Sequence, residues 1–207
     1  MRVSILIPLY NQEELIKKCL NSIPNRDDIE IIVVDDCSTD NSFNVVKENY
    51  SKVKLIKNDK NLGIGLTRNK LLDNASGDYI FFLDSDDYLY TDNFNIVIDS
   101  YLKDQVCLKP KHERNDGHKW FSTVHRGDFL KRNFIGNLRH HNLRAAEDAL
   151  FKKELNSKKG YNEEKINILV YHYNEPRVGS LVWEYRKERN FPGYNAGVEE
   201  WEEVYRK

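Results

Sequence analysis

The segment from Gly77 to Asp87, which reads GDYIFFLDSDD, decides the fold class of this chain. Its first half, Tyr79–Leu83, is an unbroken apolar and aromatic run, as in a strand that is covered on both faces of a parallel sheet. Three carboxylates follow where this strand should end, at Asp84, Asp86 and Asp87. Open α/β sheets bind ligands beyond the carboxyl ends of their strands, and carboxylate oxygens suit Mg²⁺ or Mn²⁺. The segment therefore predicts a cation site, with an acidic turn that begins the next helix as the alternative.

Apolar runs on either side of this segment predict further strands. Buried strands are expected at Val3–Ile7, Ile29–Val34 and Val53–Ile56, and a last clear strand at Ile166–Tyr173. Apolar residues at helical spacing predict helices between them, and we expect Asn11 to cap the first helix. Such alternation is typical of an α/β fold, in which helices cover both faces of a mostly parallel, Rossmann-like central sheet.

The alternation is less regular after about residue 104. Strands of the opposite sense are expected at Val106–Leu108 and Phe121–His125, separated by a polar loop at Lys109–Lys119. Helices are expected at Asp128–Asn133 and Ala145–Leu155. The C-terminal tail has a narrow apolar stripe, which predicts a final helix that packs on the body of the protein, with association into a homo-oligomer as the alternative.

Length and composition limit the number of domains and the compartment. The chain has 207 residues, of which 40% are hydrophobic and 31% charged, enough for one substantial core but short for two complete domains. No apolar run is long enough for a transmembrane segment, and no signal peptide is visible. The three cysteines lack the spacing of a disulfide framework or a zinc site. These features predict a single domain in the cytoplasm.

Charge is distributed unevenly along the chain. Residues 105–144 hold nine Lys and Arg against three Asp and Glu, a balance of +6, although the whole chain has a formal net charge of −1. The same segment contains five of the six histidines and several aromatic residues. A basic surface with aromatic side chains suits a polyanionic partner. The alternative is a solvated basic face that balances an acidic one.

Polar residues follow the expected strands at what should be a common edge of the sheet. Tyr10 and Asn11 follow the first strand, and Asp36 follows the second. A planar base can stack on Tyr10 while Asp36 accepts a hydrogen bond from the base. A turn that contains Gly63 lets a ligand approach the backbone closely, and Arg68, in the helix that follows, can reach a phosphate or ribose.

Taken together, these stretches resemble the family 2 glycosyltransferases with the GT-A fold. The matching stretches are VSILIPLYNQEELIKKCLNSI, IEIIVVDDCSTDNS, NLGIGLTRNKLLDNASGDYIFFLDSDD, AAEDALF and, more loosely, VYHYNEPRVGSL. The resemblance implies one glycosyltransferase domain over residues 1–207, with a nucleotide-sugar-binding half at 1–103 and, at 104–207, an acceptor-binding half with a small acceptor-side extension and a helical tail. It implies transfer of a sugar, with inversion, from a nucleoside diphosphate donor, for which UDP is our expectation, to an acceptor hydroxyl.

The resemblance also implies which residues bind the nucleotide sugar. Asp36 is the expected carboxylate that recognises the base, Tyr10 the ring that stacks on it, and Asp84 the ribose contact. The further residues expected to contact the donor are Pro8, Asn11, Gly63, Arg68, Ser85, Arg177 and Ser180.

Three acidic or imidazole groups are expected to carry the chemistry. Asp86 is the expected ligand of a divalent metal, Mn²⁺ or Mg²⁺, which neutralises the departing diphosphate. His172 is a second candidate ligand, with an ordinary buried or solvated histidine as the alternative. Asp148 in the Glu147–Asp148 pair is the expected catalytic base for the acceptor hydroxyl; a favourable charge at a helix N-terminus is the alternative for both acids.

Several partners and two other functions stay open at this point. The basic segment 105–144 is the expected docking surface for a phosphate-bearing acceptor, such as a wall polymer, a lipid-linked glycan or a nucleic acid. A nucleotidyltransferase would need a Gly-rich loop that grips a triphosphate near the first strand, and Pro8–Asn11 does not provide one. A protein that binds a nucleotide sugar without transferring it is the remaining alternative.

Overall fold

The computed structural model of the chain describes residues 1–143 and 147–174, and residues 1–173 form one compact unit. Its elements, in chain order, are β1 (Val3–Leu9), α1 (Ile16–Asn21), β2 (Ile29–Asp35), α2 (Ser42–Asn49), β3 (Lys54–Lys57), α3 (Ile64–Asn74), β4 (Tyr79–Phe82), β5 (Tyr88–Leu89), α4 (Thr91–Ser100), β6 (Cys107–Arg114), β7 (Lys119–Phe121), β8 (Phe129–Lys131), α5 (Arg132–Ile135), α6 (Glu147–Ser157) and β9 (Glu163–Tyr173). Within this described part, none of the helices has the length and apolar character that crossing a membrane requires.

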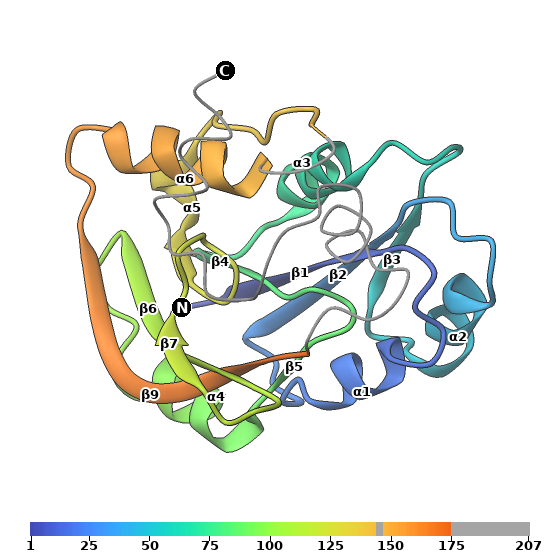
Figure 1. Cartoon of the computed structure of the whole chain (residues 1–207), viewed down its shortest axis with the longest axis horizontal. Coiled ribbons are helices and arrows are strands. Elements are labelled where there is room, and N and C mark those ends of the chain that lie inside the picture. Colours follow the sequence, from blue (N-terminus) through green and yellow to red (C-terminus); the bar gives the residue numbers. More distant parts are fainter. Residues whose placement is uncertain (144–146, 175–207) are drawn as a thin grey trace. The chain divides into compact units, whose positions relative to one another are not determined.

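Among the described residues, nine strands form one sheet, in the order β3-β2-β1-β4-β8-β6-β9-β5, with β7 paired to β6 (Figure 1). β3, β2, β1 and β4 are parallel to one another, and β8 is antiparallel to β4. All seven residues of β1 are buried, because this strand has a neighbour on each side and helices on both faces. The predicted α/β class with a mostly parallel central sheet is confirmed.

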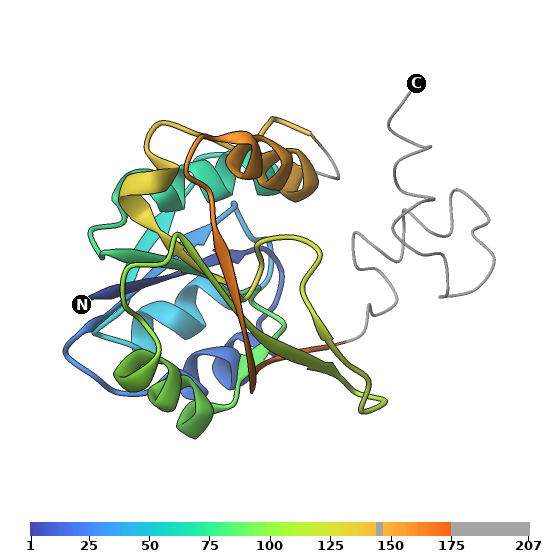
Figure 2. The same ribbon diagram turned by 90° about the vertical axis from the view of Figure 1, so that its left-hand side faces the viewer.

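Helices cover both faces of the sheet, and each face has its own apolar core. Val3, Ile5 and Ile7 of β1 pack with residues of α1, α2 and α4, whereas Leu6 packs with residues of α3, α5 and α6. This division follows from the alternation of side chains along a strand. Figures 1 and 2 show α3 and α6 on one side of the sheet and α1 and α4 on the other.

The sheet differs from the sequence prediction between residues 105 and 135. The expected polar loop at Lys109–Lys119 is wrong, because β6 continues to Arg114 and buries Lys109 in an ion pair with Asp128. β6 is antiparallel to β8 and therefore has the same sense as β4, so the expected opposite sense of the strand at Val106–Leu108 is also wrong.

Two further elements of this region were predicted with the wrong structure. The expected strand at Phe121–His125 belongs to β7 only at its first residue. The expected helix at Asp128–Asn133 begins as β8, because Phe129 and Leu130 pair with β4 and are fully buried there. Pairing with a distant strand thus overrides the local pattern, which is common for short segments.

Gly77 joins α3 to β4 at a point where the backbone has no room for a side chain. A Cβ at this position would lie 2.7 Å from both the backbone N and the Oγ of Ser4 and 2.9 Å from the carbonyl O of Arg2. The Ser4 hydroxyl already accepts a hydrogen bond from the Gly77 N–H and donates one to Glu30. We therefore expect Gly77→Ala to lower the free energy of unfolding by about 1–3 kcal/mol.

Urea denaturation measures this loss. The matched control is Glu48→Ala, at an exposed position on α2, which should change stability by less than about 0.5 kcal/mol. Equal midpoints for the two variants would mean that the loop before β4 adjusts without cost.

Candidate active site

The carboxyl ends of three parallel strands meet at one edge of the sheet. β1 pairs with both β2 and β4, which sets Leu9 opposite Asp35 and Leu6 opposite Phe82. The segments that follow these strands therefore start side by side, at the edge where α/β sheets bind ligands. They contain the predicted residues Tyr10, Asn11, Asp36, Asp84, Ser85 and Asp86, while Pro8 lies within β1 opposite Val34.

Asp36 holds the glycine turn in place through its carboxylate. One oxygen accepts hydrogen bonds from the side-chain amide of Asn58 and the N–H of Leu62, both at 2.8 Å, and the other accepts from the N–H of Gly63 at 2.9 Å. Gly63 has a φ of 84°, which favours glycine, and the space around its Cα is open. The turn before α3 is therefore fixed from β2 and presents an uncovered backbone.

Asn11 connects the end of β1 to the loop after β2. Its side-chain oxygen accepts a hydrogen bond from the N–H of Thr39 at 2.8 Å, and its own N–H donates to the hydroxyl of Ser38 at 3.0 Å. The expected cap on the first helix is therefore wrong: α1 begins at Ile16, without a side-chain cap. Tyr10, just before Asn11, is 45% exposed, so its ring is accessible at the edge.

Two arginines connect the Asp84 carboxylate to the two acids at the start of α6. Arg68 Nη2 lies 3.0 Å from Asp84 Oδ1, and its Nη1 donates to Glu147 Oε1. Arg126 Nη1 lies 3.0 Å from Asp84 Oδ2, and its Nη2 lies 3.7 Å from Asp148 Oδ2. Asp84 and Asp148 are thus connected through a chain of alternating charges.

Burial and opposite charge act against each other in this network. Burial raises the pKa of Asp84, but the charges of Arg126 and Arg68 outweigh burial, so the pKa lies below its usual value. For Glu147, burial has the larger effect and raises the pKa despite the charge of Arg68. Burial lowers the pKa of Arg126, but Asp84 more than compensates, and the guanidinium stays charged. Asp84 is therefore ionised between two permanent cations.

The three acids of the DSDD turn have different surroundings. Asp87 is 1% exposed and accepts a hydrogen bond from the hydroxyl of Tyr171. Burial, followed by the charges of Asp86 and Asp84, raises the pKa of Asp87 well above its ordinary value. Asp86 is only partly buried, and Ser85, between Asp84 and Asp86, is buried. Asp87 is a structural acid in the core, whereas Asp84 and Asp86 lie at the surface of the edge.

The imidazole of His172 has partners other than the DSDD turn. Its Nδ1 lies 3.1 Å from the hydroxyl of Tyr90 and its Nε2 lies 2.7 Å from the side-chain oxygen of Asn115. The ring stacks on Tyr88 with centroids 4.2 Å apart, where β5 pairs with β9. A role as a metal ligand would require one of these hydrogen bonds to break.

Arg126 is the residue of this network whose place sequence reasoning missed. It belongs to the basic segment 105–144, and an isolated bridge between Phe82 and Arg126 holds it beside β4. Lys131 and Arg139 of the same segment instead pair with Asp104 and Asp73. The glycine that follows Arg126 is the one local indication that this segment is tightly packed. A Cβ at Gly127 would lie 2.5 Å from the His112 ring, a close approach that only glycine allows.

Some predicted features lie outside the described residues. Arg177, Ser180 and the expected C-terminal helix fall within residues 175–207, and Ala145 and Ala146 fall within residues 144–146. The expected contacts of Arg177 and Ser180 with the donor stay predictions.

Comparison with known proteins identifies related sequences. The family model described as glycosyl transferase family 2 matches residues 4–173. A poly(ribitol-phosphate) beta-glucosyltransferase from Bacillus spizizenii is 45% identical over 97 residues, which are 43% of this chain and 15% of that protein. This chain therefore spans a small part of the length of that relative.

Solved structures resemble the fold over most of the chain. TarS 1–349 from Staphylococcus aureus, in complex with UDP-GlcNAc, has a TM-score of 0.72 and 23% identity, with 86% of this chain and 59% of that chain covered. The mannosyltransferase PcManGT from Pyrobaculum calidifontis, in complex with GDP-Man and Mn²⁺, has a TM-score of 0.69 and 19% identity, with 90% and 60% covered. At these identities the similarity concerns the fold, and it confirms the predicted GT-A class.

Proposed function

The chain belongs to glycosyl transferase family 2, and from this premise we propose that its strand-end site transfers a sugar from a nucleoside diphosphate sugar to an acceptor hydroxyl, with inversion. The observation that carries the proposal is the ion-pair chain from Arg68 through Asp84 and Arg126 to Asp148. It connects the acidic turn after β4 to the first turn of α6, so that a donor and an acceptor held at this edge would lie between them.

Asp148 is the proposed catalytic base. Its side chain is partly exposed at the start of α6, and one oxygen lies 3.7 Å from Arg126 Nη2. A carboxylate oriented in this way can accept the proton of an acceptor hydroxyl while that hydroxyl attacks the anomeric carbon. Attack from the side opposite the diphosphate gives inversion. Glu147, which is 5% exposed and bound to Arg68, supports the network from inside.

Asp86 is the proposed ligand of a divalent cation, Mn²⁺ or Mg²⁺. Asp86 lies on the same turn as Asp84 and is partly exposed at the edge of the sheet. The donor set fits a hard cation, which in proteins often uses one or two carboxylates together with phosphate oxygens. When bound, such a cation offsets the negative charge that develops on the departing diphosphate. The Mn²⁺ in the PcManGT structure supports this assignment.

The donor is proposed to be a UDP-sugar. Tyr10 offers an exposed ring for the base, and Asp36 and Gly63 form the turn against which the nucleotide would lie. The UDP-GlcNAc in the TarS structure supports a uridine donor. Arg177 and Ser180, after β9, stay proposed contacts of the diphosphate.

The acceptor is proposed to be a phosphate-bearing polymer. Residues 105–144 carry a balance of +6, and the Bacillus spizizenii relative is named for a poly(ribitol-phosphate) acceptor. A polyanion would be attracted to this segment by its net charge. Lipid-linked glycans and nucleic acids are the other polyanionic acceptors that the same charge would suit.

Release of UDP tests the proposal. The full chain is incubated with UDP-glucose or UDP-GlcNAc and Mn²⁺, with poly(ribitol phosphate), with free ribitol, or with no acceptor. We expect the polymer to raise UDP release by at least about tenfold over free ribitol, which corresponds to 1.4 kcal/mol of transition-state stabilisation. Donor binding by calorimetry without UDP release on any acceptor or water would instead indicate a protein that binds nucleotide sugars without transferring them.

A further inference from the structure

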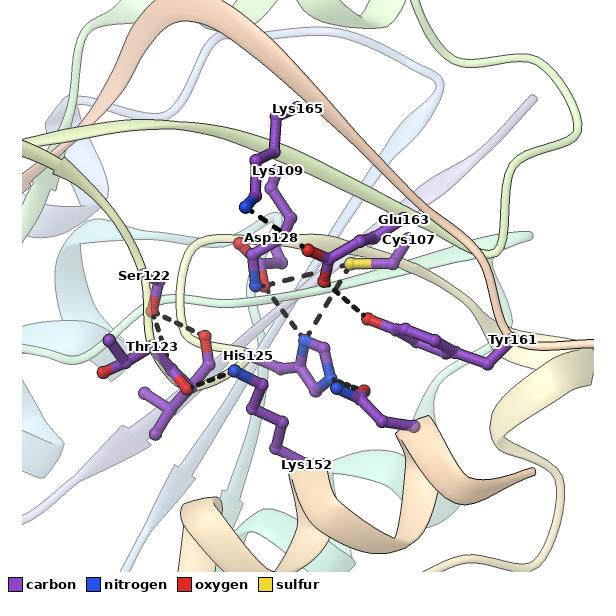
Figure 3. A network of polar contacts seen from close by, with 12 residues as sticks. Cys107, Lys109, Ser122, Thr123, His125, Asp128, Lys152, Tyr161, Glu163 and Lys165 are labelled. Atoms are coloured by element: carbon purple, nitrogen blue, oxygen red, sulfur yellow. Dashed lines mark hydrogen bonds and ion pairs between the residues drawn. The ribbon is translucent and has the colours of Figure 1, made fainter. Parts of the chain in front are cut away.

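A second group of polar side chains, distinct from the residues of the DSDD turn, lies in the interior (Figure 3). Cys107 comes from β6, and His125 and Asp128 come from the segment before β8. Cys107 Sγ lies 3.9 Å from His125 Nδ1 and 3.9 Å from Asp128 Oδ2, and the last two atoms are 2.9 Å apart. The three residues are between 0% and 3% exposed. A thiol, an imidazole and a carboxylate thus converge on one buried point.

The orientation of the His125 ring leaves its Nδ1 directed at this point. Its Nε2 lies 3.1 Å from the side-chain oxygen of Asn156 on α6, while its Nδ1 lies 2.9 Å from Asp128 Oδ2. Histidines that bind metals usually donate their second ring N–H to such an oxygen, which fixes the tautomer and the ring plane. His125 therefore has the outer hydrogen bond of a metal ligand.

The Asp128 carboxylate is satisfied on one oxygen only. Lys109 Nζ lies 2.6 Å from Oδ2, which is also the oxygen that faces His125 and Cys107. Oδ1 is buried and has no hydrogen-bond partner. A buried carboxylate oxygen without a partner costs free energy, and such atoms are rare in folded proteins. The single charge of Lys109 therefore leaves part of the Asp128 carboxylate without a binding partner.

We infer that Cys107, His125 and Asp128 bind a zinc ion. Zinc is bound in proteins by thiolate, imidazole and carboxylate groups in tetrahedral geometry, and its usual bond lengths place neighbouring ligand atoms about 3.3–3.6 Å apart. The three observed separations of 2.9–3.9 Å reach this geometry with shifts of a few tenths of an ångström. Thiolate disfavours Mg²⁺ and Mn²⁺, so this site and the proposed donor-cation site select different metals. The wide spacing of the cysteines along the chain gave no indication of zinc.

Lys109 is the competitor for the zinc ion. It is 2% exposed; burial lowers its pKa, but the Asp128 charge outweighs burial and raises it, so the ammonium occupies the cation position beside Oδ2. Zinc carries twice that charge and also gains the thiolate and the imidazole. Glu163, whose charge already acts on Lys109, would offer the displaced ammonium a second carboxylate.

The zinc ion would connect this interior site to the active edge. His125 and Asp128 are the two ends of the four-residue segment that carries Arg126, and His125, Arg126 and Asp148 border the same cavity of about 10 Å³. Bonds from the metal to His125 and Asp128 would hold both ends of this segment in place and thereby fix the position from which Arg126 contacts Asp84 and Asp148. The inference does not rest on the proposed transfer reaction.

Cobalt titration tests the inference on the full chain. After chelation and removal of bound metal, Co²⁺ is added anaerobically with a reductant that does not bind cobalt. We expect one equivalent to produce a thiolate-to-cobalt charge-transfer band and tetrahedral ligand-field bands, which Zn²⁺ abolishes by displacement and excess Mg²⁺ does not. Zn²⁺ should also raise the melting temperature. Absence of the charge-transfer band from the wild-type protein overturns the inference, whatever the outcome for sugar transfer.

Three variants assign the band to this site. Cys107→Ser should lose it, whereas Cys19→Ser should keep it, although Cys19 Sγ lies 3.6 Å from the carbonyl O of Asp84 in the DSDD turn. Lys109→Met removes the competing ammonium and should tighten cobalt binding by at least about tenfold, because the Lys109 charge lies 2.6 Å from the Asp128 oxygen that the ion would bind. Retention of the band in Cys107→Ser, or its loss in Cys19→Ser, would place cobalt elsewhere and overturn the inference.

Discussion

Asp148→Asn is expected to lower the rate of sugar transfer by about 10²–10⁴-fold while donor binding stays within about twofold of the wild-type value. The asparagine amide occupies nearly the same volume but accepts no proton from the acceptor hydroxyl. Asp148 lies on α6 at the partly exposed end of the network, 3.7 Å from Arg126, so its replacement leaves the Arg126–Asp84 pair intact. Single-turnover transfer and calorimetry with UDP-sugar and Mn²⁺ separate the two quantities.

Asp86→Ala is the matched comparison, because the same active site should then fail at a different step. Its loss removes the proposed cation ligand, so metal-dependent donor binding should disappear, and the rate should fall because no donor is held. Asp148→Asn is expected to bind donor and not transfer it, and Asp86→Ala not to bind it. Normal transfer by Asp148→Asn would show that another group, such as Glu147, accepts the proton.

The elements that could be predicted from the sequence are those whose burial is continuous along the chain. β4 is apolar and aromatic over its whole length, and β1 is apolar apart from Ser4; both occur as expected because each has neighbours on both sides and helices on both faces. β6 and β8 could not be predicted correctly, because their character depends on partners far away in sequence. From the sequence alone, Lys109 is expected in an exposed loop. In the structure its Nζ lies 2.6 Å from Asp128 Oδ2 in the interior.

The sequence predicts the site residues that directly follow parallel strands. It does not predict the residues that reach the site from distant segments through long side chains. The position of Asp36 and Asp84 at one edge of the sheet follows from the parallel register of β2, β1 and β4 alone. The position of Arg126 follows from a bridge to Phe82 that no local pattern announces. The same holds for the group around His125, whose members come from three elements separated by tens of residues. Sequence motifs identify metal sites whose ligands lie close together in the sequence. They do not identify a candidate site whose residues come together only through strand pairing.

Arg126 also yields the second large expected effect, in which two measured quantities change in opposite directions. Arg126→Met is expected to lower kcat by about 10²-fold, because the guanidinium that orients Asp148 and balances Asp84 is lost. The same change should tighten Mn²⁺ binding several-fold, since a positive charge beside the acidic turn repels a divalent cation. A purely structural role would weaken both.

The control for this prediction is Arg139→Met. Arg139 belongs to the same basic segment, but it pairs with Asp73 at the surface, where ion pairs contribute about 0–1 kcal/mol. We expect it to change neither kcat nor Mn²⁺ affinity beyond about twofold. Weaker Mn²⁺ binding by Arg126→Met would mean that the arginine holds the carboxylates in the geometry that the cation needs. Because charge repulsion and geometric support predict opposite signs, the Mn²⁺ titration of this one variant decides which of the two dominates at the edge of the sheet.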